Sequence, residues 1–372
     1  MSLLALLTGS AAPVPPEPTP APEITAEPLR LLTRAQTIDA PVVERTITTT
    51  GLTAPALIPG RTVPTADLTL IGTTAAMDRN QFEAHSWEFQ TDAAAVVLRL
   101  KAGGLNMRAH RVYVDGSPIV APYHRQDTDA QVKIDLGAAG TWRTIRVDLS
   151  ALTLQGIDVP TDARVQATAP RKKLYILGDS WIEGASYRPK ADGTGNENGP
   201  GFEHMAFLTA RMLNAAPIIG GIGGTGYAAR ESLGVHYAAP TRLDRLVSHK
   251  PDAVLVFGSI NDGSSDCGPN ATAVYQRIAT DLPGVPVVVS GTQDWGQTSG
   301  PAPGNQTIIN AAKAAPNVVG TVDTLAEDWV PAGDAVLNNK AHNNAHLTTE
   351  GNAYYGERTA QVIAKALGIK AS

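Results

Sequence analysis

One short stretch decides the fold of the second half of the chain: Lys173-Leu174-Tyr175-Ile176-Leu177-Gly178-Asp179-Ser180. Its apolar run, bounded by a turn, is typical of a buried parallel strand. Gly178-Asp179-Ser180 then leads the chain off the carboxyl edge of the sheet. Because open α/β sheets bind ligands at that edge, Ser180 is expected where a substrate would arrive. Taken alone, Gly-Asp-Ser is also ordinary turn chemistry.

Two further apolar runs end in turns that carry chemistry. Residues 216–219 precede five glycines between Gly220 and Gly226, and residues 253–257 precede Asn261. Glycine lets a backbone N–H approach a ligand closely, and an Asn amide aimed into the same crevice can stabilise a negatively charged oxygen. A flexible loop, a phosphate-cradling loop and an ordinary Asn turn stay open as alternatives. The glycines also fit G-x-G-x-x-G loosely, which would suit a dinucleotide.

A histidine near the end of the chain completes the set. His346 precedes a segment whose apolar residues recur at helical spacing, and a neutral imidazole can take a proton from a serine. His342 is a second candidate, whereas His204 lies in an apolar-periodic run and is expected to be structural. The four segments together supply a nucleophile, a glycine for close approach, an amide donor and a base, as acyl transfer requires.

On these residues the chain resembles the SGNH hydrolases, also called the GDSL-like esterase and lipase superfamily. The resemblance covers about residues 170 to 370. It implies a three-layer, flavodoxin-like α/β domain with a five-stranded parallel sheet, and catalysis without a cofactor or metal. The residues that it implies are Ser180 and His346 as the catalytic pair. The oxyanion hole would comprise the N–H groups of Ser180 and Gly224 (or its neighbour Gly223), and the Asn261 amide of the Gly258–Asp262 turn.

The sequence departs from the family at the residue that should orient the histidine. The family has Asp three positions before it, and this chain has Asn343. A neutral amide supplies no charge to stabilise the imidazolium. Asn343, Asp323, Asp328, Asp334 and a backbone carbonyl are therefore the candidates for the orienting group of a Ser/His dyad or a triad. Residues proposed to line the substrate are Trp181, Asp262 and Trp295.

The first half of the chain has a different pattern, and a length of 372 residues favours two domains. Short segments rich in β-branched residues alternate with turns, without helices between them, which predicts a β-sandwich of jelly-roll type. The strands expected are 42–50, 66–71, 86–90, 95–100, 111–115 and 144–148, with a hairpin at 114–118. The domains predicted are 1–35, a Pro-rich extended arm; 36–168, the sandwich; and 169–372, the hydrolase. Trp87, Trp142 and Tyr123 either stack on sugars or belong to the core.

Composition excludes several classes of protein. With 30 Lys+Arg and 35 Asp+Glu, the net charge of −5 argues against a nucleic-acid partner, and no apolar run is long enough to span a membrane. Cys267 stands alone, so the chain offers neither an intramolecular disulfide nor a thiolate zinc cluster, and we expect a small buried side chain there.

The N-terminal arm, which has seven prolines within residues 13–28, suggests where the protein acts and what it assembles with. The whole chain is similar to minor tail proteins of phages that infect actinobacteria, which implies a virion location and tail-protein partners for the arm. The function expected is a serine esterase that removes short acyl groups such as acetyl from an acylated glycan or small ester, as a monomer or a homo-oligomer. One alternative is a secreted bacterial carbohydrate esterase, in which residues 1–7 would be part of a signal peptide. A second is an inactive receptor-binding or structural virion protein, and a third is a nucleotide-binding or redox protein.

Overall fold

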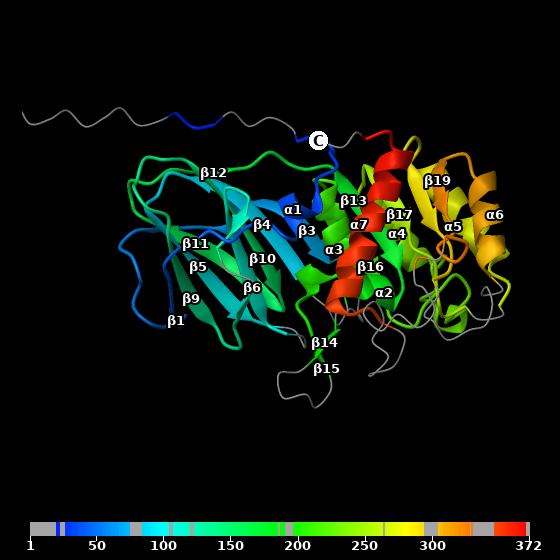
Figure 1. Cartoon of the computed structure of the whole chain (residues 1–372), viewed down its shortest axis with the longest axis horizontal. Helices are drawn as coiled ribbons and strands as arrows, with labels where there is room; N and C mark the ends of the chain where they lie inside the picture. The colour runs from blue at the N-terminus through cyan, green and yellow to red at the C-terminus, as the bar shows by residue number, and fades with distance from the viewer. Residues whose placement is uncertain are drawn as a thin grey trace, which may run out of the picture.

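The structure is a computed structural model with two halves arranged along its long axis (Figure 1). It describes residues 20–22, 27–74, 84–103, 107–119, 123–184, 187–189, 196–262, 265–293, 304–327, 329 and 346–369. Strands fill the first half, and strands alternating with helices fill the second. This agrees with the mixed α/β class expected from the sequence.

A parallel sheet forms the centre of the second half. Its strands are β13 (Lys173–Gly178), β16 (Ala216–Gly221), β17 (Ala253–Val256), β18 (Val287–Ser290) and β19 (Val318–Val322). Over the described residues their order is β19-β18-β17-β13-β16, with every neighbouring pair parallel, so the expected five-stranded parallel sheet is confirmed. The strand order reverses beside β13, which places a ligand crevice at the carboxyl ends of β13 and β17.

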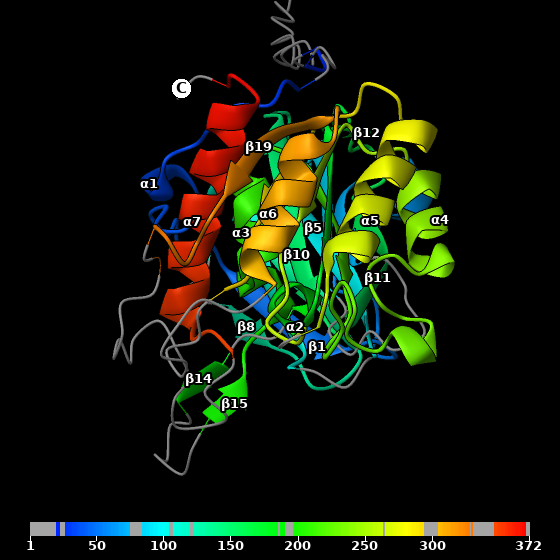
Figure 2. The ribbon, with the colours of Figure 1, turned by 90° about the vertical axis from the view of Figure 1, so that its right-hand side faces the viewer.

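Helices cover both faces of this sheet (Figure 2). On one face lie α3 (Met205–Met212) and α7 (Thr349–Ala366); on the other lie α4 (Pro240–Ser248), α5 (Gly268–Asp281) and α6 (Asn305–Ala314). The alternation of side chains along β13 explains the two cores, because Ile176 joins one apolar cluster and Tyr175 the other. The three layers are those that the resemblance implied, and α7 is the last helix predicted from the spacing of its apolar residues.

The first half consists of two facing sheets around one apolar cluster, as a β-sandwich requires. One sheet contains β1 (Ile47–Gly51), β9 (Ala130–Asp135), β5 (Ala95–Ala102), β11 (Leu152–Val159) and β2 (Arg61–Val63). The other contains β3 (Thr69–Thr74), β4 (Ala84–Thr91), β10 (Arg143–Ser150), β6 (Ala109–Val114) and β7 (Ser117–Pro118), with β8 (His124–Arg125) on β6 and β12 (Val165–Ala167) on β4. The hairpin expected at 114–118 is confirmed: Val114 pairs with Ser117 across a turn in which Asp115 and Gly116 have φ of 52° and 84°.

The aromatic residues considered for sugar stacking make contacts within the protein. Trp87 packs against the sandwich core, the Arg164 guanidinium lies 5.0 Å from the centre of the Trp142 ring, and Tyr123 meets Phe202 edge to face. These contacts favour the structural interpretation for all three.

The two halves share a sheet, which the domain boundary at 168/169 did not anticipate. Strand β3 pairs antiparallel with β4 and parallel with β16, where Ile218 lies opposite Thr73. Among the described residues, the parallel strands and one face of the sandwich therefore form a continuous twelve-stranded sheet. Composition could not reveal this, because the pairing joins segments about 145 residues apart, and no local pattern encodes such a contact.

The described part of the N-terminal arm is packed against the second half. The N–H groups of Arg30 and Leu32 donate to the carbonyl groups of Leu213 and Met212, at 3.2 and 2.6 Å. Helix α1 (Arg34–Thr37) follows, with a capping box between Thr33 and Gln36. The remainder of the expected arm, residues 1–19 and 23–26, lies outside the described residues.

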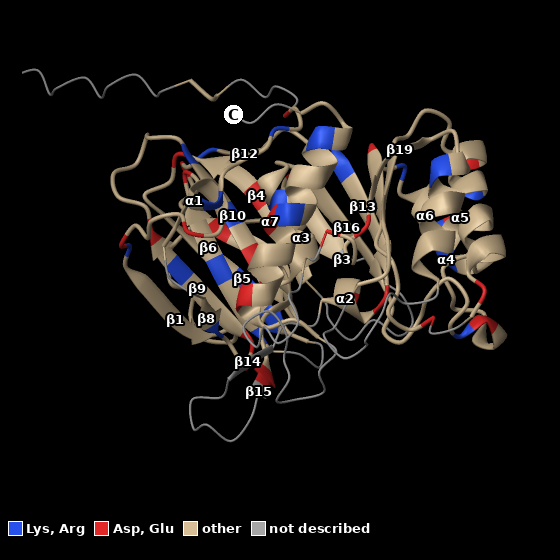
Figure 3. Cartoon of the chain, turned by 45° about the vertical axis from the view of Figure 1, so that its right-hand side comes forward, with Lys and Arg blue, Asp and Glu red and all other residues tan. Residues whose placement is uncertain are grey.

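Short elements complete the described structure. They are α2 (Ser180–Glu183), β14 (Tyr187–Pro189), β15 (Asn196–Asn198), and the 3₁₀ turns η1 (Thr65–Asp67), η2 (Gly201–Glu203) and η3 (Glu231–Leu233). Acidic and basic residues are interspersed over both halves in the view of Figure 3. Within the described ranges, no helix has the length and apolar character needed to cross a bilayer.

Candidate active site

The turn that carries Ser180, the candidate nucleophile, leaves the carboxyl end of β13 and is called the nucleophile turn for that candidate. Asp179 caps the short helix α2, and its Oδ1 accepts from the Trp181 N–H at 2.9 Å. Ser180 is the first residue of that helix and is partly exposed, and the helix ends at Gly184, whose φ of 113° requires glycine. The sequence prediction of a strand followed by an exposed serine turn is thus reproduced.

The glycine-rich segment after β16 lies against this turn. A Cβ on Gly221 would stand 2.3 Å from the Glu183 backbone nitrogen. A Cβ on Gly223 would stand 2.5 Å from the Glu183 Oε2 and 3.7 Å, an ordinary contact distance, from the Ser180 Cβ. Gly224 has a φ of 70°, and its missing Cβ would point at the Arg230 guanidinium, 2.6 Å from Nη2. The structure therefore places Gly223 directly beside Ser180, while the Cβ side of the expected Gly224 faces Arg230.

The nucleotide-binding interpretation of these glycines lacks its structural context. In a dinucleotide fingerprint the glycines open an α-helix, whose N-terminus holds the pyrophosphate. Here the segment leads into the 3₁₀ turn η3, and the next α-helix begins only at Pro240. The glycines instead allow close packing of α2 and of the turn after β17.

Asn261 lies beside the nucleophile turn, as predicted. Its Nδ2 donates to the Asp179 Oδ2 at 3.1 Å and to the Thr225 carbonyl at 2.9 Å. Both hydrogens of the carboxamide are therefore engaged within the protein, so an oxyanion can use this donor only by replacing one of the two acceptors. The sequence pattern gave no indication of this competition.

Asp262, expected to line the substrate, has another role in the structure. It is 5 % exposed, and its carboxylate accepts from the backbone N–H groups of Tyr227, Ala228 and Ala229 at 2.8–3.0 Å. It thereby ties the turn after β17 to the end of the glycine-rich segment. Trp181, also expected to line the substrate, is 2 % exposed, and its ring packs on Phe257 and Tyr355 in the core.

The buried carboxyl group of Asp179 is electrostatically unusual. Burial raises its pKa to about 7, and the nearby Asp262 charge acts in the same direction. Hydrogen bonds from the N–H groups of Trp181 and Ile260, and the charge of Arg242, oppose this shift. Asp179 can therefore exchange a proton near neutral pH, next to the nucleophile.

Arg242 was not singled out from the sequence, and it holds the site together. This buried residue of α4 donates through Nη2 to the carbonyl groups of Gly178 and Gly220, at 2.8 and 2.7 Å. Its Nη1 donates to the Thr225 Oγ1 at 2.9 Å. One guanidinium thus fixes the carboxyl ends of β13 and β16 relative to each other. An arginine on an amphipathic helix usually faces solvent, so the sequence contained no signal for this contact.

His346 lies near His204, which contacts the turn that carries Ser180. His204 caps α3, its Nδ1 accepts from the Ala206 N–H at 3.2 Å, and it also hydrogen-bonds to the Trp181 backbone. Burial, followed by repulsion from His346, lowers the pKa of His204 to about 3. The imidazole of His346 therefore lies within electrostatic range of a residue bonded to the neighbour of Ser180. The buried capping position of His204 agrees with the structural role expected for it.

Of the side chains considered for the orienting group, Asp323 lies within the described residues. Asn343, Asp328, Asp334 and the alternative base His342 lie outside the described residues, as does Trp295. The Asp323 Oδ1 accepts from the Asn305 Nδ2 at 2.9 Å and from the Ala326 N–H at 3.0 Å, and so belongs to the start of α6 and the turn after β19.

The buried Cys267 is a structural residue, as expected. Burial raises the pKa of its thiol to about 12, so it stays protonated at neutral pH and cannot act as a nucleophile. Across the described positions, no cluster of three or more His, Cys, Asp or Glu side chains suits a metal ion.

Comparison with known families agrees with this arrangement. Residues 176–354 match the GDSL-like Lipase/Acylhydrolase family. The chain carries a GDSL-like lipase/acylhydrolase domain. The matched segment includes Ser180, the glycine-rich segment, Asn261 and His346, and such a domain supports an ester hydrolase. A search of curated proteins found no sequence match.

Solved structures share the fold over most of the chain. The salicylyl-acyltransferase SsfX3 from a tetracycline biosynthetic pathway is 17% identical with a TM-score of 0.59, covering 86% of this chain and 98% of its own. A family two carbohydrate esterase from Clostridium thermocellum, solved with cellohexaose, is 16% identical with a TM-score of 0.56, covering 81% and 99%. A family two enzyme with a carbohydrate binding domain from Corynascus thermopiles (Myceliophthora fergusii) is 19% identical with a TM-score of 0.53, covering 81% and 99%. The coverage shows that the β-rich half and the GDSL-like domain occur together in these folds.

Proposed function

We propose that the protein is a serine esterase that removes short acyl groups, such as acetyl, from a polar carrier such as a polysaccharide. One observation carries the proposal. Ser180, Gly223 and Asn261, from three different turns, converge at the carboxyl edge of the parallel sheet within a GDSL-like domain. The switch point of the strand order lies at the same edge, where α/β folds bind their ligands.

The proposed reaction is acyl transfer to water. The Ser180 Oγ attacks the ester carbonyl carbon while His346 takes its proton, and the oxyanion is stabilised by the N–H groups of Ser180 and Gly224 (or its neighbour Gly223) and by the Asn261 amide. His346 then gives the proton to the leaving alcohol. Water, deprotonated by His346, attacks the acyl-enzyme, and Ser180 regains its proton as the carboxylic acid leaves.

The carbohydrate carrier is supported by the architecture of the similar proteins. Two of them are family two carbohydrate esterases, one solved with a glucan oligosaccharide, and both match more than four fifths of this chain. The β-sandwich continuous with the catalytic sheet therefore belongs to the same two-part arrangement. We extend their substrate class to this chain as part of the proposal.

Hydrolysis of p-nitrophenyl acetate by the wild type and by Ser180→Ala tests the proposal. We expect the variant to lose about a thousandfold or more in kcat, because the nucleophile is essential to the covalent route. A fluorophosphonate probe should label the wild type and not the variant. Equal, slow hydrolysis by both proteins without labelling would favour an inactive, binding-only domain.

Substitutions near the histidine test the dyad. We predict that His346→Ala loses nearly as much kcat as Ser180→Ala, whereas Asn343→Ala loses much less, because a neutral amide adds no charge stabilisation to the imidazolium. Asp328→Ala and Asp334→Ala, measured in parallel, identify an acidic orienting residue if one of them approaches the loss of His346→Ala. A comparable loss for Asn343→Ala would show that Asn343 holds the imidazole.

We further propose, from the proline-rich arm, that the esterase acts as part of a phage tail on the host envelope. Antibody labelling of purified phage particles, with mass spectrometry of their proteins, tests this location. Detection in a bacterial culture supernatant and not in particles would instead identify a secreted carbohydrate esterase.

A further inference from the structure

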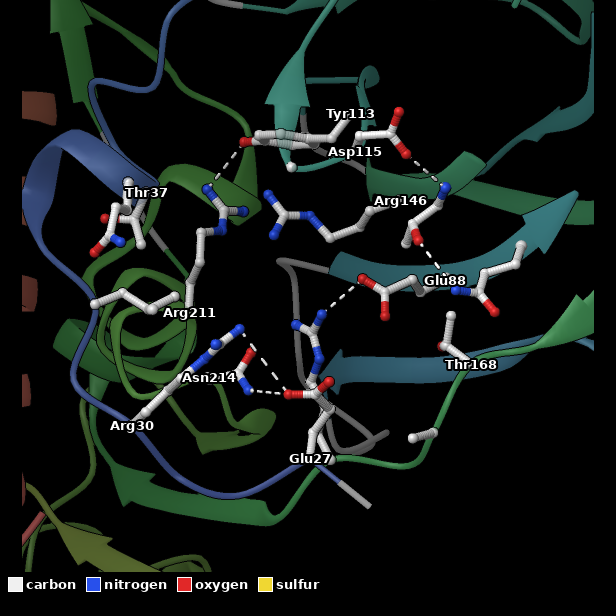
Figure 4. Close-up of a pocket in the computed structure, with 17 residues that line it drawn as sticks. Glu27, Arg30, Thr37, Glu88, Tyr113, Asp115, Arg146, Thr168, Arg211 and Asn214 are labelled. Atoms are coloured by element: carbon white, nitrogen blue, oxygen red, sulfur yellow. Dashed lines mark hydrogen bonds and ion pairs between the residues drawn. The ribbon is translucent and has the colours of Figure 1, made fainter. Parts of the chain in front are cut away.

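A polar cavity of about 600 Å³ lies at the junction of the two halves (Figure 4). Its walls come from residues 27–37, from β4, β6 and β10, from the segment before β13 and from the end of α3. Because Arg171 precedes β13 and Asn214 precedes β16, the cavity lies at the amino ends of these strands. Ser180 follows the other end of β13, roughly 20 Å away for six residues of strand. The cavity is thus separate from the candidate active site.

Three arginines of this cavity lie close to one another, and two of them have carboxylate partners. Arg211 pairs with Asp148 at 2.5 Å, and Arg171 pairs with Glu88 at 2.6 Å. These pairs leave no net charge between them. Arg146, the third, lies beside Arg211 below the Tyr113 ring in Figure 4.

Arg146 shares its nearest carboxylate, Asp148, with Arg211. Its guanidinium carbon lies 3.7 Å from the centre of the Tyr113 ring, and only 14% of its side chain is exposed. The Asp148 Oδ1 forms an ion pair with Nε at 3.4 Å, and the same carboxylate accepts from the Ser86 hydroxyl and from the Arg211 guanidinium. Among the described residues, the buried Nε has no hydrogen-bond acceptor. The three arginines share two carboxylates, Asp148 and Glu88, so the cluster carries one positive charge that an anion in the cavity would stabilise.

The rest of the lining contains Glu27 and Asp115, whose carboxylates pair with Arg30 and Arg143, and several neutral hydrogen-bonding groups. Side-chain amides and hydroxyls come from Gln36, Gln90, Thr144, Thr168 and Asn214. Such groups suit the hydroxyls of a sugar, and the volume is that of a small-molecule site.

We propose that this cavity binds a small hydroxylated oxyanion, a sugar acid or a sugar phosphate, whose charged group pairs with Arg146. The planar fork of a guanidinium matches two oxygens of a carboxylate or phosphate, and stacking on Tyr113 fixes its orientation. The amides and hydroxyls around it bond to the sugar hydroxyls. This binding does not depend on ester hydrolysis, because its residues lie at the opposite edge of the sheet.

Isothermal titration calorimetry of the full chain tests the site with three probes: D-glucuronate, D-glucose 6-phosphate and D-glucose. We expect binding of at least one anion at millimolar concentration and none of neutral glucose. Preference for glucuronate or for the phosphate identifies the source of the oxyanion. Binding should also raise the thermal unfolding midpoint, with a shift that grows with the logarithm of ligand concentration above the Kd.

Two variants of Arg146 separate charge from geometry. Arg146→Gln removes the charge at similar length and should weaken anion binding at least tenfold. Arg146→Lys keeps the charge but loses the bidentate fork, and should also weaken it. The matched control is Arg99→Gln, on β5 in the other sheet of the sandwich, where Arg99 pairs with Asp158; it should bind like the wild type.

Three outcomes would overturn the proposal: binding of glucose as tight as that of the anions, unchanged anion affinity in both folded Arg146 variants, or no binding of either anion to the wild type. Thermal unfolding of each variant verifies that it is folded, and Arg146→Lys serves if Arg146→Gln is not. Each titration is repeated in a Ser180→Ala background, where the affinities should be the same.

Discussion

At the scale of single residues, the candidate site is organised by hydrogen bonds that brace its turns. The Asp179 carboxylate accepts a hydrogen bond from the Asn261 amide. The Arg242 guanidinium donates to carbonyl groups at the ends of β13 and β16. Ser180 and Asn261 could be selected from the sequence because they lie in polar turns after apolar strands, and His346 because it precedes a segment with helical spacing. The partners of Arg242 could not, because they come from the ends of β13 and β16 and from the segment after β16, which are distant from α4 in the sequence.

Asn261→Ala distinguishes an oxyanion donor from a structural brace. If the amide binds the oxyanion, kcat for p-nitrophenyl acetate should fall about 100- to 1000-fold with KM little changed. Ser259→Ala is the matched control, because Ser259 braces the same turn through the Thr225 carbonyl and the Asn261 N–H. Equal losses of kcat in the two folded variants would show that Asn261 acts only by positioning the turn.

At the scale of elements, the position of α2 depends on the glycines of β16. The helix that begins with Ser180 lies so close to this strand that a Cβ on Gly221 would overlap the backbone of Glu183 and Ile182. Backbone atoms cannot rotate away as the end of a side chain can. The sequence predicted that these glycines allow close approach to a ligand. In the structure, Gly221 instead allows close approach to helix α2 of the same chain.

Gly221→Ala is expected to displace α2 and to lower both stability and activity. Overpacking of this kind costs about 1–3 kcal/mol in the free energy of unfolding, and movement of Ser180 should reduce kcat further. Gly51→Ala is the control, because a Cβ there meets nothing within 4 Å. Urea unfolding and p-nitrophenyl acetate assays check both variants, and wild-type stability and kcat for Gly221→Ala would contradict the packing argument.

At the scale of the whole molecule, buried ionisable groups couple stability to pH. Burial, with repulsion from His124 second, lowers the pKa of His110 to about 3, and His204 is lowered similarly. In the unfolded chain each of these imidazoles takes up a proton near pH 6.5, whereas in the folded protein it does so only near pH 3. The free energy of unfolding therefore decreases as the pH falls from about 6.5 towards 3. Asp179 has the opposite effect on stability. Its pKa is raised to about 7, so as the pH falls the folded protein takes up this proton before the unfolded chain does. The stability lost through the two histidines exceeds the stability gained through the one carboxyl group.

We therefore predict that the urea midpoint is lower at pH 5 than at pH 7. One net proton corresponds to about 1.4 kcal/mol per pH unit. His110→Phe should reduce this pH dependence, because neither ring nitrogen of His110 has a hydrogen-bond partner among the described residues, and the phenyl ring takes up no proton. The benefit of His110→Phe over the wild type should be greater at pH 5 than at pH 7. An identical pH dependence of the two proteins would exclude His110 as a source.

The sequence by itself determined the features that depend on neighbours along the chain: the apolar strands that alternate with turns, the helix from Thr349, the hairpin at Asp115–Gly116 and the serine turn after β13. Periodicity and turn chemistry are local, so they can be read without a fold. Only the tertiary structure decided that β3 joins the parallel sheet, that Arg242 connects two strand ends, and that Arg146 lines a cavity while it shares Asp148 with Arg211. Each of these depends on segments far apart in the sequence, and their energies arise from burial and hydrogen bonding that exist only after the chain has folded.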